Sequence, residues 1–180
     1  MNGIRDRTSE IRHRKKPRWH LTPVYTATVS FFLLLAGFLG LLHLPPLSRL
    51  PALKTLRDKA AVALSLGFLV SGTLHFTSSA RFVEMMPPWL PWHLELVYLS
   101  GVFELLGAVG LLIRRTRRAA AWGLVALMIC VFPANVHVAL SGGSVEGLPT
   151  QRWYYWARLP FQIVYIAWAL YCSRPPVDIR

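Results

Sequence analysis

The chain has 180 residues, 54% of them hydrophobic, and carries a formal net charge of +12 at pH 7. The apolar residues form long runs rather than the mixed pattern of a soluble domain, so the sequence predicts an integral membrane protein. The positive charge could suit nucleic acid, but the basic residues lie at the ends of apolar runs, where anionic lipid and membrane topology explain them. We therefore expect the lipid bilayer, and no nucleic acid, as a partner.

Five apolar runs are about as long as the ~17 to 25 residues that a helix needs to cross a ~30 Å hydrocarbon core. They are Val24 to His43, Ala60 to Phe76, Leu94 to Ile113, Ala119 to Leu140 and Trp153 to Cys172. A helix bonds all its backbone groups internally, and none of these runs alternates as the strands of a membrane barrel do. The predicted fold class is all-α: a polytopic transmembrane four-helix bundle with an additional N-terminal hydrophobic helix.

The chain divides into four predicted parts. Residues 1–23 form a basic, flexible tail of the kind found in the cytosol, and residues 24–43 form the additional hydrophobic helix. Residues 58–172 form the four-helix membrane domain, and residues 173–180 form a short C-terminal tail. The links between the apolar runs are too short to hold a second domain.

Charge placement predicts the orientation of the four-helix domain. Lys and Arg gather in residues 49–59, 114–118 and 174–180, whereas the links 77–93 and 141–152 carry only Arg81 and Arg152. By the positive-inside rule, the first three segments lie in the cytoplasm and the two links lie outside. The basic N-terminal tail conflicts with five full crossings. The first run could cross, lie along the membrane or be a cleaved signal, and we favour an uncleaved helix.

Two formal charges lie well inside the apolar runs, namely Glu104 and Arg158. Each costs roughly 2.5 to 3.5 kcal/mol near the middle of a bilayer, so both are expected to face inward and find partners. Gln162 lies four residues after Arg158, which allows both side chains to point toward Glu104. Two interpretations remain open: a structural ion pair that joins two helices, or a pair that also lines a ligand or catalytic site.

Three further polar residues, His75, Asn135 and His137, approach the outer side of the membrane with this pair. Asn135 and His137 differ by about 200° around their helix, so both can face one pocket only if Pro133 distorts the turn. The predicted ligand-binding residues are Glu104, Asn135, Arg158, Gln162, His75 and His137. Glu104, His75 and His137 are the candidates for proton exchange, and whether the protein is an enzyme is left open.

Other chemistries lack the residues that they need. No histidine pair has metal-ligand spacing on one helix, so no metal is expected. Cys130 and Cys172 are too far apart in sequence for a redox centre, and Cys130 is expected to be a buried apolar residue. The chain contains no phosphate loop, nucleophile elbow or dinucleotide fingerprint.

Four tryptophans, Trp89, Trp92, Trp153 and Trp156, fall at the predicted outer interface. They suit an ordinary aromatic belt, which is enriched at membrane surfaces. They also suit an interfacial rim above the polar pocket, on which a planar ring such as a quinone headgroup could stack. Both interpretations remain open.

Several short segments resemble the DoxX-like family of small membrane proteins. They are Ser71-Gly72-Thr73-Leu74-His75-Phe76, Met86-Pro87-Pro88-Trp89-Leu90-Pro91, Leu99 to Gly107, Val131-Phe132-Pro133-Ala134-Asn135 and Arg158-Leu159-Pro160-Phe161-Gln162. The resemblance covers about residues 58 to 172. It implies a four-helix membrane fold and an association with redox chemistry that uses quinone. The thiosulfate oxidation known in this family is not expected here, because no cysteine pair is present.

The leading hypothesis is a multi-pass protein of the bacterial cytoplasmic (inner) membrane. Its outward-facing polar pocket would bind a small amphiphile such as a quinone, as a redox-associated subunit of a membrane or periplasmic redox partner. One alternative is a non-catalytic interaction or assembly protein with a structural Glu/Arg pair. Another is a proton-coupled carrier. The sequence leaves the ligand, the partner and the oligomeric state open.

Overall fold

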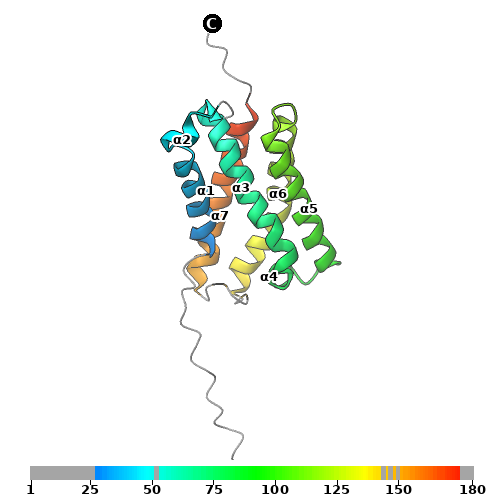
Figure 1. Cartoon of the computed structure of the whole chain (residues 1–180). Helices are drawn as coiled ribbons and strands as arrows, with labels where there is room; N and C mark the ends of the chain where they lie inside the picture. Colours follow the sequence, from blue (N-terminus) through cyan, green and yellow to red (C-terminus); the bar gives the residue numbers. More distant parts are fainter. Residues whose placement is uncertain (1–26, 51–52, 143–144, 146–147, 149–150, 175–180) are drawn as a thin grey trace, which may run out of the picture.

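The computed structural model describes residues 27–50, 53–142, 145, 148 and 151–174. These residues form helices and connecting segments, and no strand occurs among them. The long helices are α1 (Ala27–Leu41), α3 (Leu56–Thr77), α5 (His93–Leu112), α6 (Arg117–Ser141) and α7 (Arg152–Ser173). Two short helices, α2 (Pro45–Ser48) and α4 (Ser79–Glu84), lie in the links (Figure 1). The prediction of an all-α fold is confirmed.

Each predicted apolar run coincides with a long helix to within a few residues. The second run shows the largest difference, because α3 begins four residues before Ala60. Three helices, α3, α5 and α6, are long and apolar enough to cross a membrane. The predicted tail at residues 1–23 lies outside the described residues, as do residues 175–180 of the C-terminal tail.

Local sequence signals explain where the helices begin and end. The link before α5 contains three prolines, at 87, 88 and 91, which remove backbone donors and prevent a continuous helix. Trp92 then adopts a left-handed conformation with φ 54° immediately before α5. Further along the chain, Gly142 ends α6 with φ 62°, a conformation that costs glycine no steric penalty.

The long helices pack around a common interior. Helix α3 contacts α5 and α7, while α6 contacts these same two helices from the opposite side. Helix α1 packs against α3 and α7 (Figure 1). The main core cluster includes Leu35, Leu64, Leu111, Leu124 and Cys172, all of which are fully buried.

Large apolar side chains also cover the outside of this bundle. Helix α5 exposes Phe103 and Leu106, and α6 exposes Trp122 and Ile129. Such an apolar exterior is typical of helices that face lipid. Cys130 lies on this exposed face of α6, so the prediction that it is buried was wrong. It neighbours the exposed Ile129 rather than the side of α6 that packs on other helices.

Glycines allow α3 and α5 to approach closely. A Cβ atom added at Gly101 of α5 would lie 2.7 Å from the His75 Cβ and 3.2 Å from the Gly72 carbonyl oxygen of α3. Seven residues further along α5, the Ala108 carbonyl accepts a 2.7 Å hydrogen bond from the buried Ser65 hydroxyl of α3. Close contact through small residues is the usual way in which helices associate in lipid.

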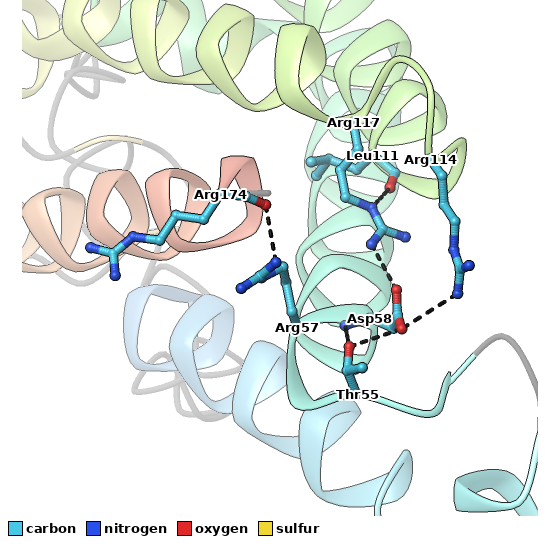
Figure 2. Close-up of polar contacts among 7 residues, drawn as sticks. All are labelled: Thr55, Arg57, Asp58, Leu111, Arg114, Arg117 and Arg174. Carbon is cyan, nitrogen blue, oxygen red and sulfur yellow. Dashed lines mark hydrogen bonds and ion pairs between the residues drawn. The ribbon is translucent and has the colours of Figure 1, made fainter. Parts of the chain in front are cut away.

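One end of the bundle, here called the basic end, is held by a buried carboxylate. Asp58 is 5% exposed and accepts a 2.7 Å hydrogen bond from Arg117 Nη1 at the start of α6. Arg114 reaches the other carboxylate oxygen at 3.7 Å, as Figure 2 shows. Arg117 Nε donates to the Leu111 carbonyl at the end of α5. These contacts tie α3, α5 and α6 together at this end.

The same carboxylate also caps its own helix. The Thr55 hydroxyl accepts from the Asp58 backbone N–H at 3.1 Å and donates to Asp58 Oδ2 at 2.9 Å (Figure 2). Nearby, Arg57 Nη1 donates to the Arg174 carbonyl at the end of α7, at 3.1 Å. All four helices α3, α5, α6 and α7 therefore have a terminus at the basic end that is fixed by polar contacts.

Replacing Gly101 by alanine is expected to destabilise the bundle by about 1 to 3 kcal/mol, because the new methyl group would overlap with His75. Gly123→Ala is the matched control, since nothing lies within 4 Å of its added Cβ. Thermal unfolding in detergent should show a lower Tm for Gly101→Ala and an unchanged or higher Tm for Gly123→Ala. Equal Tm values for the two variants would contradict the close approach of α3 and α5.

Asp58→Asn is expected to cost about 3 kcal/mol or more, because it leaves the Arg117 guanidinium without its buried counter-charge. Arg114→Gln is the comparison, since its side chain is 71% exposed and the loss should stay below about 1 kcal/mol. The free energy of unfolding of both variants can be measured by denaturant titration in mixed micelles. An Arg114→Gln loss as large as that of Asp58→Asn would overturn this assignment.

Candidate functional site

A cavity of about 260 Å³ lies inside the bundle, toward the end that carries α4 and the first turns of α7, here called the cavity end. Helices α1, α3, α4, α5, α6 and α7 all contribute to its wall. Its polar lining includes Ser71, Ser78, Arg81, Glu104, Asn135, Tyr154, Arg158, Gln162 and Tyr165. Much of the remaining wall is apolar, including Phe31, Phe68, Phe82 and Met128.

Four of the six predicted ligand-binding residues line this cavity: Glu104, Asn135, Arg158 and Gln162. His75 and His137 do not line it. Asn135 and His137 are thus separated as their helical phase requires, even though Pro133 lies inside α6. Only Asn135 of this pair reaches the cavity.

Gln162 is the most firmly held polar residue of the wall. It is 5% exposed, and its amide nitrogen donates to the Met128 carbonyl of α6. Its amide oxygen accepts a 3.0 Å hydrogen bond from Asn135 Nδ2. These two bonds join α6 to α7 and fix the orientation of both amides at the cavity wall.

Glu104 lies beside His75, which is positioned by the close approach of α3 and α5. The distance from Glu104 Oε2 to His75 Nδ1 is 3.7 Å, too long for a hydrogen bond. His75 Nδ1 instead donates to the Ser71 carbonyl at 3.0 Å, and the imidazole ring stacks on Phe82. Glu104 Oε2 is buried and has no hydrogen-bond partner among the described residues.

Arg158 enters the cavity from α7. Its guanidinium Nη1 lies 3.5 Å from the sulfur of Met85, a weak acceptor. Among the described residues it forms no ion pair with Glu104, although both line the same cavity. The direct Glu104–Arg158 pair expected from the sequence is therefore not formed, because each residue reaches the cavity from a different wall and packs against a different neighbour.

The four tryptophans predicted as an interfacial rim are exposed and do not line the cavity. Trp89 and Trp92 are more than 70% exposed, while Trp153 and Trp156 are about half exposed. The aromatic side chains on the cavity wall are instead Phe31, Phe68, Phe82, Tyr154 and Tyr165. This placement agrees with a belt around the protein and gives no support to stacking on the tryptophans.

Several cavity residues were not predicted from the sequence. Phe82 of α4 and Met85, which follows this helix, both line the cavity. Tyr165 lies seven residues after Arg158, on the same face of α7, and this spacing was a signal that could have been used. Asp58 at the basic end was also missed, although Thr55-x-x-Asp58 has the spacing of a capping box.

Comparison with known protein families gives one match, over residues 64–173, to a domain of unknown function, DUF8561. The chain belongs to the DUF8561 family. The matched segment of DUF8561 runs from the third turn of α3 to the end of α7 and includes every cavity residue except Phe31. Asp58 lies just outside it. No curated protein and no solved structure matches the chain.

Asn135→Ala is expected to lower the free energy of unfolding by about 1 to 2 kcal/mol, because the buried Gln162 amide oxygen loses its donor. His137→Ala, two residues along α6 and outside the cavity, should change stability by less than half as much. Chemical unfolding of both variants in the same detergent tests the difference. A His137→Ala loss that matches or exceeds the Asn135→Ala loss would argue against the Asn135–Gln162 link.

Proposed function

We propose that this DUF8561 protein is a multi-pass protein of the bacterial cytoplasmic membrane, with α3, α5, α6 and α7 as a DoxX-like transmembrane four-helix bundle. Three of these helices are apolar and long enough to cross a membrane, and the 22-residue α7 packs against α3 and α6. Helix α1 is the additional N-terminal hydrophobic helix. The arginine-rich basic end would face the cytoplasm and the cavity end would face outward.

The proposed activity is the binding of the polar headgroup of a small amphiphile in the cavity. The observation that carries this proposal is a pocket lined by polar groups from five helices, α3 to α7, within a bundle whose exterior is apolar. Polar groups inside a membrane-spanning bundle are costly, so they usually pair with one another or mark a site of function. Glu104 Oε2 and the Tyr165 hydroxyl are both buried without hydrogen-bond partners among the described residues.

A quinone is the amphiphile that the DoxX resemblance suggests, in a protein that acts as a redox-associated subunit beside a membrane or periplasmic partner. The Gln162 and Asn135 amides lie at the cavity wall, where a headgroup carbonyl would need donors. Glu104, with His75 behind it, is the group best placed to exchange a proton with such a headgroup. This part of the proposal rests on the resemblance together with the position of Glu104.

The alternative of a non-catalytic assembly protein depended on a structural Glu104–Arg158 ion pair. In the described structure the helices are instead joined at this level by Gln162, which bonds to Asn135 and Met128. Glu104 and Arg158 form no ion pair with each other among the described residues, so this pair does not hold α5 to α7. This favours ligand binding over a purely structural role for the two charged residues.

Filling the cavity tests the proposed activity directly. Ser71 lines the cavity, so Ser71→Phe should occupy the space, whereas Thr73→Phe places the same ring on the exposed side of α3. After purification, amphiphiles extracted from the two variants and from the wild type can be identified by mass spectrometry.

We expect one amphiphile to co-purify with the wild type and with Thr73→Phe and to fall at least fivefold in Ser71→Phe. Matched Tm values would show that both variants are folded. An amphiphile retained equally by both variants, or none enriched above bulk lipid in the wild type, would contradict binding in the cavity.

A further inference from the structure

The charge of Arg158 is not balanced within the described part of the chain. Its only described hydrogen-bond contact is the 3.5 Å approach to the Met85 sulfur. The three described ion pairs involve His75 with Glu104 and Asp58 with two other arginines, so none of them includes Arg158. The contrast with Arg117 is direct, because that guanidinium bonds Asp58 at 2.7 Å.

Two tyrosines of α7 line the cavity together with Arg158. Tyr154 lies one turn before Arg158 and Tyr165 two turns after it, on the same face of the helix. The Tyr165 hydroxyl is buried without a hydrogen-bond partner, and the Tyr155 hydroxyl accepts a 3.2 Å bond from the Val145 N–H. A free hydroxyl beside an unpaired guanidinium offers two donors to one incoming acceptor.

The charged residues that line the cavity are Arg81, Glu104 and Arg158, so the described lining carries one more positive than negative charge. Arg81 is exposed and can be hydrated, whereas Arg158 lies deeper, next to Met85 and the tyrosines. A guanidinium is best matched by an oxyanion, which accepts two parallel N–H bonds. A neutral carbonyl would accept a bond but leave the charge uncompensated.

We infer that the cavity takes the acidic headgroup of a single-chain amphiphile, with a carboxylate held by Arg158 and Tyr165. This inference rests on the proposed binding function and names the class of its ligand. It differs from the quinone suggestion, because it requires a negative charge on the ligand. The bonded Asn135 and Gln162 amides line the same cavity.

The apolar part of the wall has a place for the chain of such an amphiphile. Phe31, Phe68 and Met128 line the cavity beyond the polar groups, and Val70 and Leu74 extend the lining to the exposed surface of α3. An acyl chain can therefore run from the headgroup over an apolar surface toward lipid. A volume of about 260 Å³ suits one headgroup and the start of one chain.

Two other sources of negative charge need to be separated in the test. The phosphate of a phospholipid has the same oxyanion chemistry as a fatty-acid carboxylate. Glu146, in the link before α7, lies outside the described residues. A Glu146→Gln variant therefore tests whether this acid supplies the negative charge. Glu104 is the described acid in the cavity, so its variant is informative as well.

The experiment uses the full chain in phosphatidylcholine nanodiscs, with radiolabelled oleate as the probe and empty nanodiscs to subtract partitioning. Unlabelled oleate, its neutral methyl ester, decylubiquinone and phosphatidylglycerol are the competitors. We expect methyl oleate and decylubiquinone to compete at least about tenfold more weakly than oleate, because neither supplies the charge-assisted bonds. Phosphatidylglycerol that competes as well as oleate would instead identify the phosphate of a membrane lipid as the ligand group and overturn the carboxylate.

Variants then locate the charge that binds the carboxylate. Arg158→Gln should weaken oleate binding about tenfold or more, while Arg158→Lys should retain part of it. Tyr165→Phe should weaken it several-fold without loss of Tm. Glu104→Gln should bind oleate more tightly than the wild type, because it removes the negative charge of the described cavity lining. Glu146→Gln should bind at least as tightly as the wild type.

The wild-type competition remains decisive even if Arg158→Gln fails to fold. Equal competition by oleate and methyl oleate would overturn the inference. If Ser71→Phe still excludes a neutral amphiphile, the proposed binding function would stand while the acidic headgroup would not. If Ser71→Phe lowers the amount of no co-purifying amphiphile and oleate fails to bind, the proposed binding function and the acidic headgroup would both be contradicted.

Discussion

The close contact of α3 with α5 sets the position of the charged groups at the cavity. At Gly72 and Gly101 the two helices approach so closely that one added methyl group would touch the partner helix. This contact brings His75 of α3 beside Glu104 of α5 and leaves the carboxyl group of Glu104 facing the cavity. If α5 were displaced outward, both the wall of the cavity and the burial of Glu104 would be lost.

The buried carboxylates Asp58 and Glu104, at the basic end and at the cavity, have different surroundings. At the basic end, Asp58 is satisfied by Thr55, Arg114 and Arg117, and its bonds tie three helices. At the cavity end, Glu104 and Tyr165 retain buried oxygens without partners among the described residues. A buried polar group without a partner costs about 1 to 3 kcal/mol, so it is expected where a ligand supplies the missing bond. The basic end therefore stabilises the fold, and the cavity end is available for function.

The sequence predicted the helices well because each is a long apolar run ended by glycine, proline or charge. It also predicted that Glu104, Asn135, Arg158 and Gln162 would gather, since depth along a helix follows from residue number alone. The sequence did not predict which of these side chains would contact one another. Whether Arg158 meets Glu104 or Met85 depends on the rotation of α7 and on the fold of α4, which comes from a proline-rich link without periodicity.

The fate of the two histidines shows the same limit. His75 lies near the end of α3 and His137 near the end of α6, but the His75 ring stacks on Phe82 and neither histidine lines the cavity. Helical phase separated His137 from Asn135 already in the sequence, and only an assumed distortion at Pro133 brought the two together. The role of Asp58 was not predicted for a different reason. Helix α3 begins before its apolar run, and Asp58 lies in this polar first turn.

The central claim is that the cavity lined by α1, α3, α4, α5, α6 and α7 holds a ligand. An experimental density map of the full chain, purified with its native lipids, tests this most directly. The account predicts density inside the cavity, in contact with the Arg158 guanidinium and continuing past Val70 and Leu74 toward the bilayer. A cavity without such density, with Arg158 paired instead to Glu104 or to another acid of the chain, would contradict it.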